Sequence, residues 1–377
     1  MDQKPSILML IYYFHPIVGG AERQCLLQAK KLTEMGYSVS VLTTWHKKLV
    51  CSESVDGIVV KRMIFEIPFP VLRKISLFFC ILFYLLVNRK KYDMVHVHQF
   101  NALTICACFA KFFTGKKVVC KQACESPYSG FDLIENSRLA CLYRKVIRSL
   151  DCLLAISRTT YNEAVTHGFE NKVSFLPNGV FIPQWKWKNA KTPQVIFSGR
   201  LHPQKGADLF IRAAAMDKEI SRSYILLGDG PEREKLEKTA SGNTVFYGKV
   251  MKPEKFLEND GVFYVLPSRA EGLSNALLEA MARGIPSIVS SSVSGAADLA
   301  GEQLEVCRDF TVHENLILVP PERPECIYQA LQYLFAHISV AESLSCNSRN
   351  FVHKNYSIEN ICSRLAKLYC KILGCKE

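Results

Sequence analysis

The sequence predicts an α/β protein with two Rossmann-like domains in tandem, each built on a parallel sheet. Apolar runs of strand length alternate with helical stretches, once over 1–180 and a second time over 181–355. Such alternation is typical of parallel strands joined by crossover helices. A stretch at 177–193 with three prolines and no periodicity separates the two series. Because ligands of such sheets bind at the carboxyl ends of the strands, a cleft between the two domains could hold one ligand on each side.

The first series opens with a continuous apolar run at 7–14, as a buried parallel strand requires. A glycine pair follows, and then a helical stretch over 21–35, which Gly36 ends. Later strands of the same sheet are predicted at 39–43, 94–98, 117–120 and 153–156.

The second series is predicted to have strands at 195–198, 224–227, 244–247, 261–266 and 287–290. Helices at 231–238 and 275–283 fall between these strands. The last segment, 356–377, has the apolar spacing of an amphipathic helix, and we expect it to pack back on the first domain.

Charge and cysteine content limit the classes of protein. Lys and Arg outnumber Asp and Glu by 47 to 35, which gives a net charge of +12. This excess suits phosphate-bearing small molecules, an anionic membrane surface or nucleic acid, and no basic-aromatic or helix-turn-helix pattern supports nucleic acid. The 15 cysteines are odd in number and include no C-x-x-C, so we interpret them as buried free thiols. No signal peptide is predicted, and the expected location is the cytoplasm or the cytoplasmic face of the membrane.

A strongly apolar segment lies at 75–87, between Arg73-Lys74 and a basic run at 89–91. Its 13 residues fall short of the ~20 that a membrane-spanning helix needs. Two interpretations stay open: a buried core helix, or an interfacial helix whose basic flanks reach lipid headgroups, which would give peripheral membrane contact through 73–91.

The strongest chemical signal is the stretch 267–286, PSRAEGLSNALLEAMARGIP. Glu271 ends a strand-to-helix loop, and Ser274 or Asn275 can cap the helix that follows. The first helical turn offers unsatisfied N–H groups and the positive end of the dipole, which suit a diphosphate. Glu271 and Glu279 are expected to face the same cleft, where carboxylates can accept hydrogen bonds from sugar hydroxyls. Taken alone, the motif could equally be an ordinary capped helix with a solvated Glu279.

A second motif, SGRLHPQKG at 198–206, also follows a strand directly. Arg200 and Lys205 supply two permanent cations on a glycine-bounded loop, and both side chains suit phosphate oxygens. The spacing differs from that of a P-loop. The chain contains no Asp-x-Asp and no His/Cys cluster with metal spacing, so no metal site is predicted.

Together these residues resemble the retaining, GT-B-fold glycosyltransferases of the "group 1" type, and the resemblance runs the whole length of the chain. The matching segments are Gly19-Gly20-Ala21-Glu22-Arg23, Pro177-Asn178-Gly179, Ser198-Gly199-Arg200 with Lys205-Gly206, Leu227-Gly228-Asp229-Gly230-Pro231, Val245-Phe246-Tyr247-Gly248, and Glu271 to Glu279 with Gly284-Ile285-Pro286. The fold that the resemblance implies is two Rossmann-like domains facing a cleft.

The resemblance also implies a role for each matching residue. Arg200 and Lys205 would neutralise the diphosphate leaving group and Glu271 would contact the donor sugar, so these three form the expected catalytic set. Glu279 would bind the ribose. The full expected donor-binding set is Gly19, Gly20, Arg200, Lys205, Val250, Glu271, Gly272, Leu273, Ser274 and Glu279. Retention would follow from front-face attack, with the leaving phosphate oxygen taking the acceptor proton and no cofactor beyond the nucleotide-sugar co-substrate.

The chain departs from the family pattern at several positions. Where many relatives carry a histidine, the loop 121–126 has none, so no catalytic histidine is assigned there. His98 is expected to point toward the cleft, and a structural or acceptor-contact role is favoured over a catalytic one. Phe181 and Asp298 stand where relatives often have Asp and Glu, which bears on donor identity more than on class.

The resemblance therefore predicts a hexosyltransferase-type enzyme that moves a sugar, with retention, from a nucleotide sugar to a glycan or lipid-linked acceptor. UDP is the favoured nucleotide, and cell-surface polysaccharide synthesis is the favoured setting. Two other functions stay open: an inactive sugar-nucleotide-binding partner protein, and a sugar-nucleotide epimerase of the same fold. The intact cations and carboxylates argue against the first, and the E-x7-E spacing argues against the second.

Overall fold

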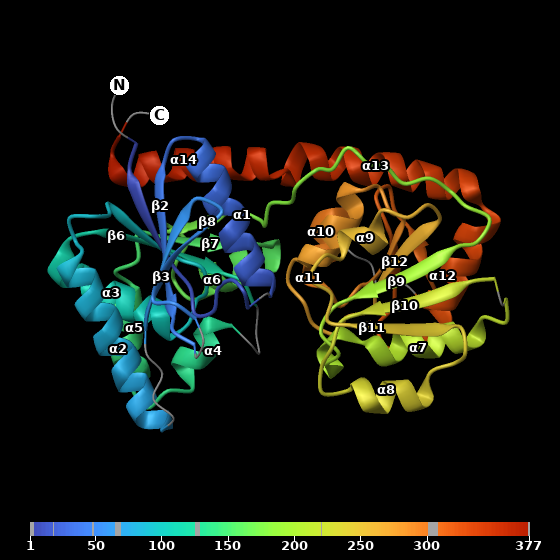
Figure 1. The fold of residues 1–377 in the computed structure, drawn as a ribbon, viewed down its shortest axis with the longest axis horizontal. Helices are drawn as coiled ribbons and strands as arrows, with labels where there is room; N and C mark the ends of the chain where they lie inside the picture. Colours follow the sequence, from blue (N-terminus) through green and yellow to red (C-terminus); the bar gives the residue numbers. More distant parts are fainter. Residues whose placement is uncertain are drawn as a thin grey trace. The chain divides into compact units, whose positions relative to one another are not determined.

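The computed structural model describes residues 4–17, 19–46, 49–64, 69–124, 129–219, 221–300 and 308–375. Contacts within the chain divide it into two compact units (Figure 1). Unit 1 comprises Met1–Gly179 and Ile358–Glu377, and unit 2 comprises Val180–Ser357. Each unit is built on one parallel-dominated sheet with helices between its strands, so the predicted α/β class is confirmed.

Unit 1 contains an eight-stranded sheet in the order β3-β4-β2-β1-β5-β6-β7-β8. The strands are β1 (Ser6–Leu10), β2 (Ser38–Thr44), β3 (Ser52–Val55), β4 (Ile58–Ile64), β5 (Met94–Val97), β6 (Lys117–Gln122), β7 (Cys152–Ala155) and β8 (Val173–Phe175). All neighbours run parallel except β3 and β4, which form an antiparallel edge hairpin that the sequence analysis missed.

One strand prediction was too long. The run at 7–14 was expected to be a single strand, but β1 ends at Leu10, where its pairing with β2 and β5 ends. Ile11 and Phe14 are nevertheless buried, at 0% and 2% exposure. Their apolar character therefore reflects packing of the loop after β1 against the core.

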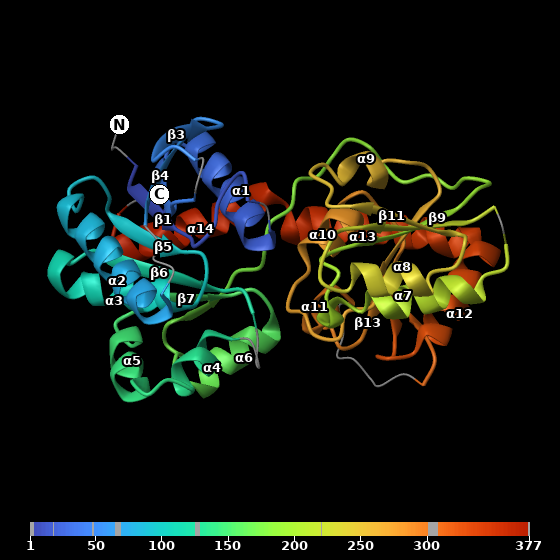
Figure 2. The same cartoon turned by 60° about the horizontal axis from the view of Figure 1, so that its bottom comes forward.

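Helices cover both faces of this sheet (Figure 2). They are α1 (Gly20–Glu34), α2 (Pro70–Val87), α3 (Ala102–Thr114), α4 (Gly130–Glu135), α5 (Ala140–Ile147), α6 (Arg158–Thr166) and α14 (Ile358–Leu373). Buried side chains of α1 and α14 share a core with one face of the sheet. Those of α2, α3 and α5 share a second core with the opposite face.

The apolar segment at 75–87 lies in α2 and has two unlike faces. Leu77, Ile81 and Leu85 are buried in the second core. On the other side, Phe79 and Phe83 are 61% and 69% exposed. One side of α2 is thus packed against the core, and the other side lies at the surface. Within the described part of the chain, no helix is both long and apolar enough to cross a membrane.

Unit 2 contains a seven-stranded sheet in the order β11-β10-β9-β12-β13-β15-β14. Its strands are β9 (Gln194–Ser198), β10 (Ser223–Leu227), β11 (Thr244–Gly248), β12 (Val262–Leu266), β13 (Ser287–Ser290), β14 (Thr311–Val312) and β15 (Ile317–Val319). Only the short β14 runs antiparallel to its neighbour. The helices are α7 (Ala207–Met216), α8 (Arg233–Thr239), α9 (Glu254–Leu257), α10 (Asn275–Ala282), α11 (Ser294–Ala300), α12 (Pro324–Ala336) and α13 (Ile338–Tyr356), with a 3-10 turn at Pro203–Lys205.

Strand order in each sheet reverses at one point. In unit 2, β9 has β10 on one side and β12 on the other. The loops that follow β9 and β12 therefore start side by side at the same edge of the sheet and lead away in opposite directions. In unit 1, β1 stands in the same relation to β2 and β5. Crevices at such reversal points are where open α/β sheets bind ligands.

Candidate active site

Lys205 and Glu271 form the charged centre of unit 2. Nζ of Lys205 lies 2.5 Å from Oε1 of Glu271, and Oγ of Ser268 donates to Oε2 of the same carboxylate at 3.0 Å. The two charged side chains keep 24% and 15% of their exposure, so a ligand can still reach them. The pair joins the loops that follow β9 and β12, at the reversal point of the sheet.

Hydrogen bonds to backbone carbonyls hold these two loops together. The side-chain amide of Gln204 donates to the carbonyl of Ala270, and the backbone N–H of Arg269 donates to the carbonyl of Gln204, both at 2.8 Å. Gly206 has a φ of +67°, and a Cβ there would lie 2.1 Å from the carbonyl oxygen of Pro267. Only glycine fits this approach, which explains the glycine that closes the first motif.

A second close approach fixes the start of the loop after β9. Gly228, with a φ of +155°, would place a Cβ 1.8 Å from the carbonyl oxygen of Gly199. A Cβ on Gly230 would lie 2.3 Å from the carbonyl oxygen of Leu201. Gly228 and Gly230, which follow β10, therefore allow their backbone to pack directly against that of Gly199 and Leu201, the residues on either side of Arg200.

The Arg200 side chain itself is exposed. Among the residues that the structure describes, its guanidinium has no hydrogen bond or ion pair, so it can accept an anionic ligand. Val250, the remaining predicted donor contact of this unit, is half-buried in the loop after β11. That loop leaves the sheet at the same edge, because β9, β10 and β11 run parallel.

Helix α10 begins beside the ion pair. Its cap is Ser274, whose Oγ accepts from the backbone N–H of Leu277 at 3.5 Å. The carbonyls of Glu271 and Gly272 accept from the backbone N–H groups of Ser294 and Gly295, at 2.9 and 3.0 Å. The start of α11 thus holds the loop that leads into α10, with Gly272, Leu273 and Ser274 buried in place.

Tyr264 is a buried tyrosine of β12, the strand that leads into the motif. Its side chain is fully buried, and its hydroxyl donates to the carbonyl of Ser198 at 3.3 Å. Burial raises the pKa of this phenol well above its usual range, and the negative charges of Glu271 and Glu279 raise it further. The charges of both carboxylates therefore act on the same buried phenol, which the sequence alone did not reveal. The resulting site combines two cations, two carboxylates and a helix start, a combination that can bind a phosphorylated sugar.

The predicted glycine loop lies in unit 1. Gly19 is the residue that caps α1, in an extended conformation, and Gly20 is the first residue of the helix. A Cβ on Gly19 would lie 2.4 Å from Oε2 of Glu22, so the carboxylate of the first turn folds over this glycine. The two glycines follow β1 and thus belong to the reversal point of the first sheet.

His98 directly follows β5 and is only 1% exposed. Its ring stacks on that of His96, with 4.3 Å between the centroids, and His96 Nδ1 is hydrogen-bonded to the Tyr369 hydroxyl at 2.6 Å. Neither nitrogen of His98 has a hydrogen-bond partner among the described residues. Burial lowers the pKa of His98 well below its usual value, and the neighbouring His96 and Lys121 lower it further, so this imidazole is neutral.

Lys121, which sequence reasoning did not single out, lies in the same core. Its side chain is 2% exposed, and within the described part of the chain its ammonium has no hydrogen-bond partner. Burial lowers its pKa to about 8. The sequence offered one sign of this burial: Lys121 stands two residues after Val119, a core residue of β6, and alternate residues of a strand share a face. Of the histidine-free loop at 121–126, residues 125 and 126 lie outside the described residues.

No group of three or more His, Cys, Asp or Glu side chains among the described residues is placed to hold a metal ion. The cysteines within the described ranges are free thiols.

Two family models match the chain. The model "Glycosyltransferase Family 4" matches residues 18–182, and "Glycosyl transferases group 1" matches residues 192–337. Similar proteins include an uncharacterised glycosyltransferase of Methanocaldococcus jannaschii, which is 26% identical over 97% of both chains. The 2-deoxystreptamine N-acetyl-D-glucosaminyltransferase of Niallia circulans is 25% identical over 71% of this chain and 73% of its own. A component of the Arabidopsis thaliana phosphatidylinositol N-acetylglucosaminyltransferase is 22% identical over 98% of this chain and 89% of its own.

Solved structures share the fold. Anabaena HepE in complex with UDP-glucose superposes with a TM-score of 0.77, at 16% identity, over 97% of this chain and 100% of that one. Sucrose-phosphate synthase of Thermosynechococcus elongatus gives a TM-score of 0.76, at 17% identity, over 98% and 100%.

Proposed function

We propose that this chain, which belongs to the GT-B-fold glycosyltransferases of the group 1 type, is a retaining enzyme. It transfers the sugar of a UDP-sugar donor to a glycan or lipid-linked acceptor. The proposed setting is the synthesis of a cell-surface polysaccharide. The UDP and UDP-glucose complexes of the structurally similar Anabaena protein support UDP as the nucleotide.

The observation that carries this proposal is the Lys205–Glu271 pair at the reversal point of the second sheet. A diphosphate bound there would meet the Lys205 ammonium, the exposed Arg200 guanidinium and the start of α10. The two cations would compensate the charge that develops on the departing phosphate, without a metal. Glu271 would accept hydrogen bonds from the donor sugar, and Glu279, in the helix that follows, from the ribose.

The proposed reaction exchanges one bond for another at the anomeric carbon. The bond from that carbon to the β-phosphate oxygen breaks as the acceptor oxygen attacks the same face of the sugar. The departing phosphate oxygen takes the proton from the acceptor hydroxyl, so the products are the glycoside and UDP. Arg200 and Lys205 contribute most at the moment when the diphosphate leaves, because its negative charge is then largest.

The second part of the proposal is peripheral contact with the cytoplasmic face of a membrane through residues 73–91. The outer face of α2 exposes Phe79 and Phe83, and the exposed Arg89, Lys90 and Lys91 follow the helix directly. Apolar side chains bordered by cations suit the interface of an anionic bilayer. A lipid-linked acceptor would be met at such a surface.

Thermal unfolding in the presence of UDP-, GDP- and ADP-sugars tests the donor assignment, because a bound ligand raises the midpoint by mass action. We expect the largest rise with a UDP-sugar, and release of UDP on addition of an acceptor. A partner protein without activity would bind the donor yet release no UDP with any acceptor, and an epimerase would change the donor sugar without transferring it.

A further inference from the structure

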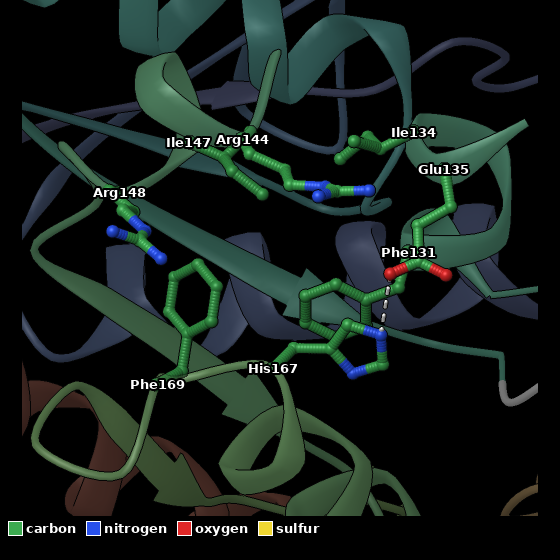
Figure 3. A pocket seen from close by; sticks show the side chains of 8 residues that line it. All are labelled: Phe131, Ile134, Glu135, Arg144, Ile147, Arg148, His167 and Phe169. Atoms are coloured by element: carbon green, nitrogen blue, oxygen red, sulfur yellow. Dashed lines mark ion pairs between the residues drawn. The ribbon is translucent and has the colours of Figure 1, made fainter. Parts of the chain in front are cut away.

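Unit 1 contains a cavity among α4, α5 and the residues that follow α6, with an empty volume of about 340 Å³ that includes open solvent at its mouth (Figure 3). Its apolar lining is buried and includes two aromatic rings; these residues are Phe131, Ile134, Ile147 and Phe169. None of the residues assigned to sugar transfer lines it. The end of α5 precedes β7 and Phe169 precedes β8, whereas Phe131 of α4 packs on Phe100, which follows β5.

Two arginines lie over this apolar lining. Arg144 is in the last turn of α5 and Arg148 is its C-cap, one helical turn apart, so both face the same side. Figure 3 shows both side chains reaching toward the middle of the cavity. Both are exposed, and neither guanidinium has an ion pair or side-chain hydrogen bond within the described part of the chain.

Among the described residues, the lining contains one acidic side chain, Glu135, which contacts His167. Oε1 of Glu135 lies 3.2 Å from Nε2 of His167, the contact drawn as a dashed line in Figure 3. The ring of His167 is also stacked on Phe131, with 4.1 Å between centroids and 14° between planes. The described lining therefore carries two arginines against one carboxylate, which leaves a net positive charge above the apolar floor.

We propose that this cavity binds the phosphate group of a lipid, with the arginines on the phosphate oxygens and the first carbons of the chain on the phenylalanine rings. Paired guanidiniums are well suited to phosphate, and a free inorganic anion would make no use of the apolar floor. Further apolar side chains are exposed on other faces of the same two helices and just before α5, since Leu133, Leu139 and Leu142 are 62%, 51% and 53% exposed. This inference rests on the membrane contact proposed above, since α2 shares its buried core with α4 and α5.

The binding step is tested with the full chain and n-octyl phosphate below its micelle concentration, by calorimetric titration. The variant is Arg144→Gln/Arg148→Gln, which changes two exposed side chains and leaves the lining intact. The control is Lys145→Gln, an exposed cation on the same helix that does not line the cavity. We expect the double variant to bind at least about tenfold more weakly, and the control to match the unaltered chain, because each lost charge-assisted hydrogen bond is worth about a factor of ten. Equal weakening in the control, or inorganic phosphate binding as tightly as octyl phosphate, would overturn the proposal.

Vesicles identify the source of the phosphate. One arm uses phosphatidylcholine with phosphatidic acid, and the other uses phosphatidylcholine with a polyprenyl phosphate, each with sedimentation as the readout. Loss of binding in the double arginine variant in the first arm identifies a bilayer phospholipid, and loss in the second identifies a lipid carrier. Loss in neither arm overturns the proposal. The rise in unfolding temperature with UDP-sugar stays unchanged in the double variant, so the failure of this inference is distinguishable from failure of the proposed sugar transfer.

Discussion

Lys205 and Glu271 neutralise each other in the structure, with 2.5 Å between Nζ and Oε1. The cation assigned to the diphosphate is therefore held by the carboxylate assigned to the sugar. A donor that binds at this site has to share or replace that contact. The residue assigned to its diphosphate and the residue assigned to its sugar are therefore already paired before the donor binds.

This coupling predicts opposite effects of Glu271→Gln on two ligands. The amide can still accept a hydrogen bond but carries no charge to offset that of the ammonium, so Lys205 becomes more available to phosphate, and free UDP should bind at least as tightly as to the unaltered chain. Sugar transfer should fall, by about a hundredfold, because the carboxylate that orients the donor sugar is lost. Titration calorimetry with UDP and turnover with the UDP-sugar separate the two effects. Tenfold weaker UDP binding in this variant would show that Glu271 does not compete with the diphosphate for Lys205.

Arg200→Ala should reduce turnover without altering the fold. The side chain is exposed and its guanidinium has no partner among the described residues, so the free energy of unfolding should stay within about 0.5 kcal/mol of that of the unaltered chain. Loss of charge stabilisation in the transition state should cost about 3 kcal/mol, or roughly a hundredfold in kcat. Arg212→Ala, which removes another exposed arginine of the same unit from α7, serves as the control and should retain full turnover. Equal rates for both variants would remove Arg200 from the catalytic set.

The order of strands and helices could be predicted because it depends on local patterns. Buried parallel strands appear as short apolar runs, and glycines mark the turns that follow them. The hairpin of β3 and β4 was missed, although Ile58–Ile64 alternates buried and exposed residues, because it lies at an edge and carries charged residues. Apolar loops cause the opposite error, in which a strand is predicted where none forms. The residues after Leu10 were predicted to continue the strand, but they form a buried loop.

The site could be predicted only in part. Motif spacing identified Arg200, Lys205, Glu271 and Glu279 as candidates, but the contact between Lys205 and Glu271 joins residues 66 positions apart. Such a contact depends on β9 and β12 being neighbours, which no local pattern specifies. The buried Lys121 contradicts the usual exposure of lysine, so composition predicts a solvated side chain there.

Gly206→Ala tests whether backbone approach positions the cation loop. Alanine at a φ of +67° is strained, and its Cβ would meet the Pro267 carbonyl oxygen at 2.1 Å. The expected loss is about 1–3 kcal/mol in the free energy of unfolding, together with weaker UDP binding as the two loops separate. Gly242→Ala is the matched control, because nothing lies within 4 Å of its Cβ position and its φ is not left-handed. Urea unfolding of both variants makes the comparison, and an unchanged Gly206→Ala would show that the loop adapts freely.

Lys121→Met should stabilise the protein at neutral pH. The lysine pKa falls from 10.5 when exposed to about 8 in the fold, so between these values the unfolded chain binds more protons and stability rises with pH. Below pH 8 the full penalty of the buried charge is present, on the order of 3 kcal/mol. Methionine has a similar length and no charge, so the variant should gain most at pH 7 and lose this advantage toward pH 10.5. Urea unfolding of both proteins at several pH values measures the difference. A variant less stable than the unaltered chain at pH 7 would indicate that the ammonium has a partner in solution.

Phe79→Ser/Phe83→Ser tests the membrane contact of α2. Both rings are largely exposed, at 61% and 69%, so removing them should leave the stability of unit 1 nearly unchanged. If these rings enter the bilayer interface, each should contribute at least about 1.4 kcal/mol, and the double variant should bind vesicles roughly a hundredfold more weakly. Phe181→Ser, at a 59% exposed phenylalanine of unit 2, is the matched control and should bind as the unaltered chain does. Sedimentation with phosphatidylglycerol vesicles provides the measurement at low and high salt. Salt should weaken the contribution of the basic run 89–91 but leave the difference between the two phenylalanine variants, because burial of apolar surface is not screened. Equal binding by both variants would exclude the outer face of α2 as the contact.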